Sequence, residues 1–163
     1  MSVFMPPGEP AEIHLMPGEF YFGSKNTRIH TVLGSCIAMT LWHPQRFIGG
    51  MNHIVLPSRI KPGEDRLDGH YADEALLLFM HELVRSHTRP AEYQVKLFGG
   101  GRMFQRSLAD KAYDVADGNI EAARALLDAS GFNIQVEHVG GSGHRSIIFD
   151  LRDGSVLVKH VKI

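Results

Sequence analysis

Two apolar segments separated by a short turn constrain the fold of this chain more than any other feature. Residues 37–42 and 47–56 are rich in apolar and β-branched side chains, and residues 43–46, His-Pro-Gln-Arg, carry turn chemistry. This pattern predicts two antiparallel strands joined by a short loop. Such a hairpin places Cys36 and His53 near the same end, where their side chains can meet.

Cys36 is the only cysteine of the chain. A thiol attacks as the thiolate, which a neighbouring base or positive field favours. His53 is the predicted base, and His30 and His43 are the alternatives by proximity in sequence. Gly34 permits a tight turn just before the cysteine, so backbone N–H groups there could face a developing oxyanion. The competing interpretation of Cys36 is a small buried core side chain, which is common for cysteine.

The sequence of this hairpin region matches two motifs of a known family. Residues 31–38 read Thr-Val-Leu-Gly-Ser-Cys-Ile-Ala, and residues 49–57 read Gly-Gly-Met-Asn-His-Ile-Val-Leu-Pro. Both resemble the signature segments of the chemoreceptor glutamine deamidases, the CheD family. Further family landmarks follow in order over residues 11–160, namely Tyr71-Ala72-Asp73, Lys96-Leu97-Phe98-Gly99-Gly100, Gly118-Asn119, Gly140-Gly141 with Arg145, and Gly154 in a final hairpin.

The resemblance implies a cysteine-dependent amidohydrolase that converts glutamine side chains to glutamate through a thioester. In that reading Cys36 attacks the amide carbon and His53 transfers the protons, with no metal and no organic cofactor. The family also carries a threonine that orients the imidazole; Thr31 is the predicted residue, and a neighbour is the alternative. Substrate binding or oxyanion support is predicted for Gly34, Ser35, Gly99, Gly100 and Arg145.

The resemblance also implies partners. The substrates are the cytoplasmic helices of methyl-accepting chemoreceptors, and family members bind a CheC-type phosphatase. A different class of function is a non-catalytic chemotaxis module that keeps the fold and docks on receptors or on that phosphatase. A third is a cysteine amidase or esterase acting on a small molecule or on receptor methyl esters.

Composition narrows the class of protein further. A chain of 163 residues fits one domain, and 17 Lys and Arg against 18 Asp and Glu provide no electrostatic attraction to nucleic acid or anionic lipid. A single cysteine excludes an intramolecular disulfide and a zinc site built on cysteine pairs. The sequence contains neither a secretory signal nor an apolar stretch approaching 18 residues, so we expect a cytoplasmic protein without direct membrane insertion.

Periodicity over the rest of the chain predicts an α/β domain of the α+β kind, with a mixed, mostly antiparallel sheet layered with two main helices over residues 11–163. Residues 1–10 are predicted to be a mobile leader. One helix is expected at 71–86, and a second from an N-cap at Asn119 to Gly131. Short edge strands are expected within 11–22, strands at 93–98, 132–139, 146–151 and 155–161, and loops at 24–28, 59–69 and 140–145.

Three glycines follow the strand predicted at 93–98. They lack both the spacing and the lysine of a phosphate-binding loop. Glycines at such a position more often let the backbone pass close to another segment. In the family that the chain resembles this turn lies by the active site, which implies a structural role there for Gly99 and Gly100. His144 and Arg145, in the loop expected at 140–145, could contact substrate or an anion.

Overall fold

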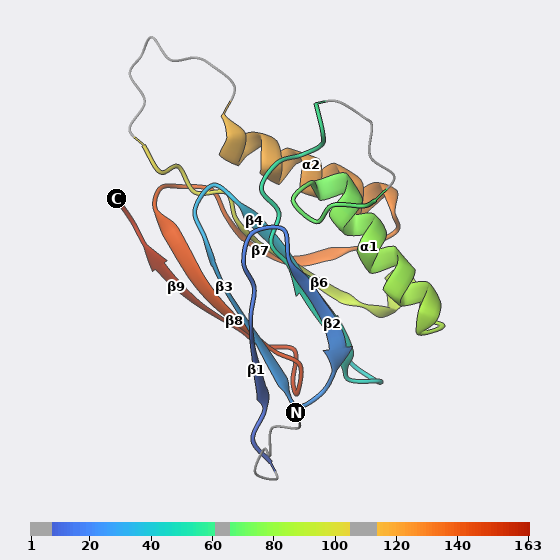
Figure 1. The fold of residues 1–163 in the computed structure, drawn as a ribbon. Helices are drawn as coiled ribbons and strands as arrows, with labels where there is room; N and C mark the ends of the chain where they lie inside the picture. The colour runs from blue at the N-terminus through green and yellow to red at the C-terminus, as the bar shows by residue number, and fades with distance from the viewer. Residues whose placement is uncertain (1–7, 61–65, 105–113) are drawn as a thin grey trace.

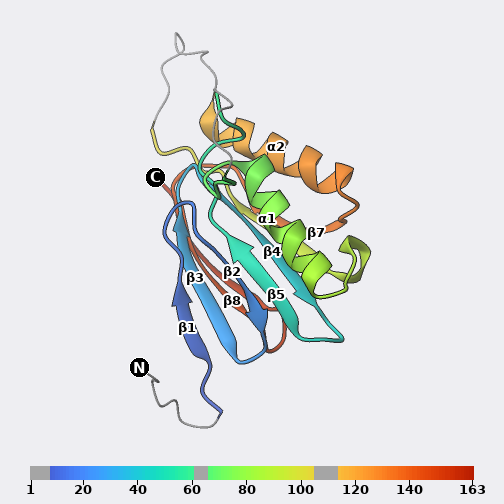
Figure 2. The ribbon, with the colours of Figure 1, turned by 45° about the vertical axis from the view of Figure 1, so that its right-hand side comes forward.

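The computed structural model describes residues 8–60, 66–104 and 114–163. Two β-sheets face each other, and two helices cover the outer face of one of them (Figures 1 and 2). The four-stranded sheet has the order β1 (Ala11–His14), β3 (Thr27–Leu33), β8 (His144–Asp150), β9 (Val156–Val161). The five-stranded sheet has the order β2 (Phe20–Ser24), β5 (Ile48–Asn52), β4 (Ile37–His43), β6 (Gln94–Gly99), β7 (Ile134–Val139). The helices are α1 (Ala72–Arg85) and α2 (Val115–Ala129), and a short 3-10 turn, Pro90–Glu92, precedes β6.

Strand pairing agrees with the predicted mixed, mostly antiparallel α+β domain. Among the named strands, β1 with β3 and β6 with β7 pair in parallel, and the other pairs are antiparallel. The short edge strands predicted within residues 11–22 are β1 and β2, which are joined through Pro17 and Gly18 and are the edge strands of different sheets. The chain therefore crosses from one sheet to the other at this point, which the sequence pattern did not predict. None of the described helices is long and apolar enough to cross a membrane.

The predicted hairpin is formed by β4 and β5. Its register pairs Thr40 with Met51 and His43 with Ile48. Because side chains alternate along a strand, Ile37 and its alternate neighbours pack under the helices, while Ala38 packs between the sheets. The hairpin thus separates two apolar cores, and each fully buried aliphatic side chain stabilises the fold by roughly 1.5–3 kcal/mol.

The first helix agrees with its prediction to within one residue at each end. Tyr71 is the N-cap and Ser86 the C-cap, and Asp73 and Glu74 lie in the first turn, where negative charge favours the helix dipole. The helix does not continue because His87 takes a positive φ of 56°.

The second helix begins at Val115, so the prediction that Asn119 is its N-cap is wrong. The carboxylate of Asp114 accepts hydrogen bonds from the backbone N–H groups of Ala116 and Asp117 and closes the first turn. Asn119 lies inside the helix with none of its surface exposed. The predicted end is confirmed, since Gly131 follows the helix with a φ of 87°.

Two predicted loops are partly strand. The loop expected at 24–28 is wrong, because β2 extends to Ser24 and β3 begins at Thr27. Asn26, with a φ of 75°, makes the tight connection, since asparagine tolerates the left-handed region. The loop expected at 140–145 ends early, because His144 and Arg145 belong to β8. Of the leader expected at 1–10 and the loop at 59–69, residues 1–7 and 61–65 lie outside the described residues.

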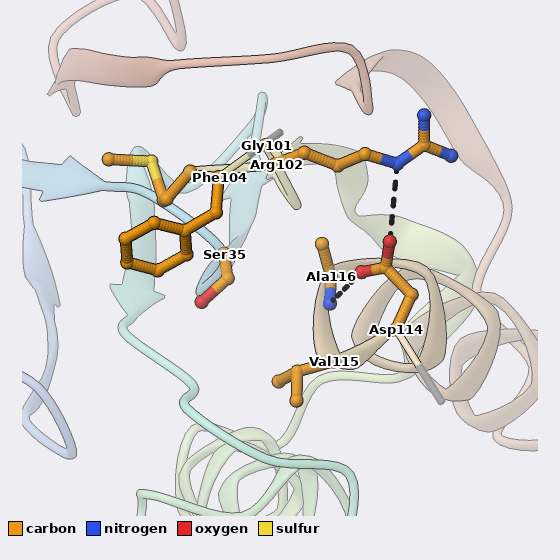
Figure 3. Close-up of a pocket in the computed structure, with 8 residues that line it drawn as sticks. Ser35, Gly101, Arg102, Phe104, Asp114, Val115 and Ala116 are labelled. Carbon is orange, nitrogen blue, oxygen red and sulfur yellow. Dashed lines mark hydrogen bonds and ion pairs between the residues drawn. The ribbon is translucent and has the colours of Figure 1, made fainter. Parts of the chain in front are cut away.

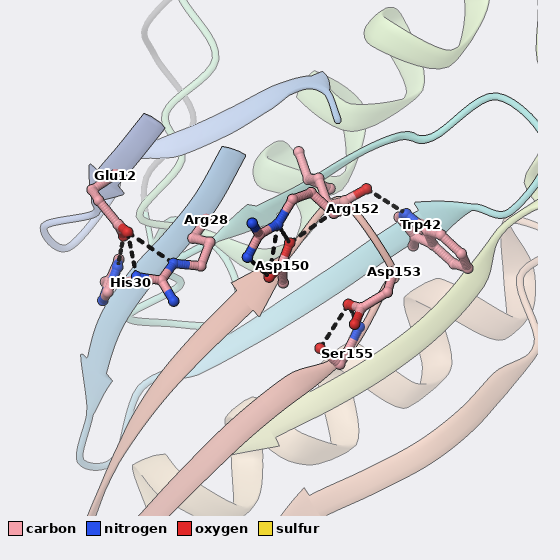
Figure 4. Close-up of polar contacts among 9 residues, drawn as sticks. Glu12, Arg28, His30, Trp42, Asp150, Arg152, Asp153 and Ser155 are labelled. Atoms are coloured by element: carbon pink, nitrogen blue, oxygen red, sulfur yellow. Dashed lines mark hydrogen bonds and ion pairs between the residues drawn. The ribbon is translucent and has the colours of Figure 1, made fainter. Parts of the chain in front are cut away.

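Polar contacts tie the strands together at the edge of the four-stranded sheet (Figure 4). Glu12 of β1 accepts a hydrogen bond from Nε of Arg28 at 2.8 Å and also contacts His30, and both partners come from β3. Trp42 of the other sheet donates its indole N–H to the carbonyl of Leu151 at 3.0 Å. These contacts hold β1 on β3 and link the two sheets.

Candidate active site

The three residues predicted to carry chemistry line one pocket of about 630 Å³. Thr31 comes from β3 of the four-stranded sheet, whereas Cys36 and His53 flank the β4–β5 hairpin of the other sheet. The connection from β1 to β2 forms another wall through Leu15 and Pro17. The pocket is therefore assembled from both sheets.

The strand register places Cys36 and His53 on the same face of the hairpin. Ile37 bridges Ile54 in the same antiparallel register that pairs Thr40 with Met51. Cys36 is thus opposite the residue two positions beyond His53, and the two side chains are diagonal neighbours. Diagonal pairs on an antiparallel sheet lie about 7–8 Å apart at their backbones, within reach of long side chains.

Thr31 orients the imidazole of His53. Its Oγ1 donates a hydrogen bond to the carbonyl of Leu15 at 2.9 Å and lies 2.7 Å from Nδ1 of His53. A hydroxyl has a single proton, and the carbonyl can only accept, so Nδ1 of His53 is the donor to Oγ1. The neutral imidazole therefore carries its proton on Nδ1 and presents an unprotonated Nε2.

Burial keeps both reactive groups neutral at pH 7. Burial raises the pKa of the Cys36 thiol, and a hydrogen bond from its own backbone N–H offsets this only in part. Burial, and to a smaller extent electrostatic repulsion from His70, lowers the pKa of His53 to about 4. The surroundings of Cys36 therefore do not favour the thiolate in the way that a neighbouring base or positive field would.

The backbone of His53 is held by the β1–β2 connection. Its carbonyl accepts from the N–H of Gly18 at 2.8 Å, and its N–H donates to the carbonyl of Glu19 at 3.1 Å. Gly18 has a φ of 84°, which favours glycine, and a Cβ at this position would lie 2.2 Å from the ring of His70. The sequence pattern did not predict that this connection contacts His53.

The glycines after β6 hold the loop that carries Cys36. The N–H of Gly100 donates to the carbonyl of Cys36, and that of Gly101 donates to the carbonyl of Gly34, both at 2.9 Å. A Cβ on Gly99 would lie 2.2 Å from the Cys36 carbonyl oxygen. The close approach expected for these glycines is therefore present, and Gly99 and Gly100 lie behind the pocket rather than in its lining.

Ser35 faces a second, smaller pocket on the other side of this loop. This pocket, of about 270 Å³, is also lined by Phe104 and Val115 (Figure 3). Arg102 and Asp114 form an ion pair at its edge, with Nε and Oδ2 3.2 Å apart. Ser35 thus contributes its backbone, not its hydroxyl, to the surroundings of Cys36.

Arg145 is buried, with 2% of its surface exposed. Its guanidinium donates to the carbonyl of Gly99 at 3.1 Å, to the carbonyl of Gly140 at 2.7 Å, and to Nδ1 of His138 at 2.8 Å. These bonds all end on protein acceptors, so Arg145 braces the glycine turn behind Cys36.

The alternative bases are engaged elsewhere. Nε2 of His43 lies 2.8 Å from a carboxylate oxygen of Glu92 at the far end of the hairpin. His30 lines the pocket of Cys36, but its Nε2 contacts Glu12. Within the described ranges, no group of three or more His, Cys, Asp or Glu side chains is placed to hold a metal ion.

The sequence missed one residue that touches both halves of the site. The side-chain amide of Asn119 donates to the carbonyls of Ser35, at 3.1 Å, and of Val55, at 2.9 Å. A signal was present, since a polar residue four positions before Ala123 and eight before Leu127 lies on the apolar stripe of the helix.

A thiol and an oriented, neutral imidazole that line one pocket are a combination found in cysteine-dependent hydrolases. A family model described as "CheD chemotactic sensory transduction" matches residues 55–160. The chain belongs to the CheD family.

Relatives match over most of the chain. "Probable chemoreceptor glutamine deamidase CheD" of Pseudomonas syringae pv. syringae is 50% identical over 151 residues, covering 92% of this chain and 85% of that protein. "Probable chemoreceptor glutamine deamidase CheD 3" of Dechloromonas aromatica is 47% identical, covering 92% and 88%. Among solved structures, the Bacillus licheniformis hypothetical protein YfiH aligns with a TM-score of 0.47 at 12% identity, over 80% of this chain and 59% of that one.

Proposed function

We propose that this protein hydrolyses glutamine side-chain amides of methyl-accepting chemoreceptors to glutamate, in the cytoplasm, as part of chemotaxis. The observation that carries the proposal is the hydrogen bond between Thr31 and His53 in a pocket that Cys36 shares. It leaves Nε2 of His53 unprotonated beside a thiol, as a general base requires. The names of the relatives support the choice of substrate.

In the first half of the reaction, the sulfur of Cys36 attacks the amide carbon as its proton passes to Nε2 of His53. The resulting imidazolium protonates the amide nitrogen, the C–N bond breaks, and ammonia leaves. A thioester between Cys36 and the former glutamine side chain remains. The hydroxyl of Thr31 accepts from Nδ1–H throughout, so it keeps the ring in the productive orientation.

In the second half, water attacks the thioester carbon and gives its proton to His53. The C–S bond breaks, His53 returns the proton to sulfur, and glutamate is released. Both tetrahedral intermediates place negative charge on the former carbonyl oxygen. The backbone N–H of Cys36, beside the sulfur, is the donor that we assign to this oxyanion.

The test uses a recombinant cytoplasmic fragment of a chemoreceptor as substrate. Mass spectrometry should detect about one added mass unit per modified glutamine, with matching ammonia release. Cys36→Ala should abolish both, and His53→Ala should lower turnover by about 10²–10⁴, as expected for loss of a general base. Unchanged turnover in folded Cys36→Ala would remove Cys36 from the mechanism, and less than a tenfold loss in His53→Ala would favour another base.

The same variants separate the enzyme from a non-catalytic docking module. Cys36→Ala should still bind the receptor fragment, because the substitution removes only the sulfur. We also propose binding to a CheC-type phosphatase, on the basis of the family resemblance. Co-purification of the wild-type protein with that phosphatase tests this, and failure to bind at micromolar concentrations would argue against it.

A further inference from the structure

Asn119 joins the two chain segments that carry the proposed chemistry. It is fully buried in α2, and its amide nitrogen donates to the carbonyl of Ser35, next to Cys36, and to that of Val55, two residues after His53. An amide nitrogen has two protons, so both are used. One side chain of the helix layer thereby holds the two chain segments together at the open end of the hairpin.

This clamp has a cost for the fold. The Oδ1 atom of Asn119 is buried and has no hydrogen-bond partner among the described residues. A buried polar atom without a partner is destabilising, and an apolar side chain of similar size would avoid that penalty. The benefit of the amide therefore lies in the two carbonyls that it holds.

The Ser35 carbonyl is the middle one of three consecutive carbonyls that are each held by a hydrogen bond, and its donor differs from those of the other two. The carbonyls of Gly34 and Cys36 accept from backbone N–H groups of the glycine turn after β6, whereas that of Ser35 depends on Asn119. In a trans peptide the N–H points opposite to the C=O, and the structure has no cis bond among its described residues. Holding the Ser35 carbonyl toward α2 thus turns the Cys36 N–H away from the helix.

We propose that Asn119 is a positioning residue for the deamidation reaction, acting by fixing the peptide between Ser35 and Cys36 so that the Cys36 N–H is presented to the oxyanion. This inference rests on the proposed function. The second bond, to Val55, holds the His53 segment in register with the same helix. Asn119 itself touches no substrate in this scheme.

The test compares two reactions of the same thiol in Asn119→Leu. Hydrolysis of receptor glutamines forms an oxyanion, whereas alkylation of Cys36 by iodoacetamide attacks a saturated carbon and forms none. Loss of an oxyanion donor typically lowers kcat by about 10²–10³, and a donor that is misdirected should lower it by at least about tenfold. For Asn119→Leu we expect kcat to fall by at least about tenfold, while KM and the rate of Cys36 alkylation stay within about threefold of the wild-type values.

Leu127→Ala is the matched control. Leu127 is fully buried on the same helix, and its side chain cannot donate a hydrogen bond to the hairpin carbonyls. This variant should destabilise α2 yet change kcat by less than about twofold. Asn119→Ala repeats the measurement if leucine prevents folding. Wild-type kcat in either folded Asn119 variant, or a parallel fall of alkylation and hydrolysis, would overturn the proposal. A wild-type protein that leaves receptor glutamines unchanged refutes the proposed function instead, which is a distinguishable result.

Discussion

Replacing Thr31 by valine tests how the imidazole of His53 is oriented. Valine has nearly the shape of threonine but lacks the hydroxyl, so the change removes two hydrogen bonds and little volume. One is the 2.9 Å bond to the carbonyl of Leu15, and the other is the 2.7 Å contact with Nδ1 of His53. Loss of the bond to Leu15 lowers the stability of the fold, whereas loss of the contact with Nδ1 changes the orientation of the His53 ring.

The size of the effect follows from burial. Thr31 is 5% exposed and His53 4% exposed, so water cannot readily replace the lost hydroxyl. A buried donor left without an acceptor costs about 1–3 kcal/mol. If the activation free energy rises by about the same 1–3 kcal/mol, turnover falls by about fivefold to 150-fold, since each 1.36 kcal/mol corresponds to a factor of ten.

The assay is the rate of mass increase in a receptor fragment, measured beside urea unfolding of each variant. Thr31→Ser keeps the hydroxyl and should retain most of the activity. Thr27→Val removes a buried hydroxyl from the same strand and the same face, far from the pocket, and should leave the rate unchanged. The reasoning is refuted if folded Thr31→Val turns over within twofold of wild type, or if the serine variant is as slow as the valine variant.

Three further predictions concern stability and pH. Because His53 has a pKa of about 4 in the folded protein and 6.5 otherwise, the unfolded state binds more protons between these values. The free energy of unfolding should therefore fall by about 2 kcal/mol as pH drops from 6.5 to 4, after allowance for solvent screening. Urea unfolding of His53→Gln should show a smaller fall over the same pH range. Gly99→Ala should destabilise the protein by about 1–3 kcal/mol more than Gly140→Ala does. Both glycines have a positive φ, but only a Cβ on Gly99 would collide with the Cys36 carbonyl. Equal shifts in melting temperature for the two variants would contradict this. Arg145→Met should lower the free energy of unfolding by about 1–3 kcal/mol, because it leaves the Gly140 carbonyl without its donor, while the Gly99 carbonyl keeps only its bond from the N–H of Gly140. A wild-type midpoint in urea would exclude the bracing role.

Local patterns in the sequence were enough to predict the hairpin and the first helix. In both segments the apolar residues repeat with the period of the element itself, and the turn residues between 43 and 46 end one strand and begin the next. The pairing of Cys36 with His53 followed from that hairpin. The choice of Thr31 came from family resemblance, because no local pattern indicates a residue of another sheet.

What the sequence did not predict depends on distant contacts. The division into two sheets requires β3 to pair with β8, more than 100 residues later. Arg145 looked like a loop residue because glycines precede it, and its burial depends on carbonyls of the Gly99 turn and of Gly140. Asn119 looked like a helix cap because asparagine favours caps, but Asp114 occupies that position and leaves Asn119 in the interior.

Thr31 belongs to the four-stranded sheet and His53 follows β5 of the five-stranded sheet, so their hydrogen bond depends on how the two sheets pack on each other. A small shift of one sheet relative to the other would break this hydrogen bond and stop the reaction, while the hydrogen bonds within each sheet remained. On warming, deamidation should therefore fade before the circular-dichroism signal does. For the same reason, a protein that binds to both sheets at once would change the rate of the reaction without entering the pocket.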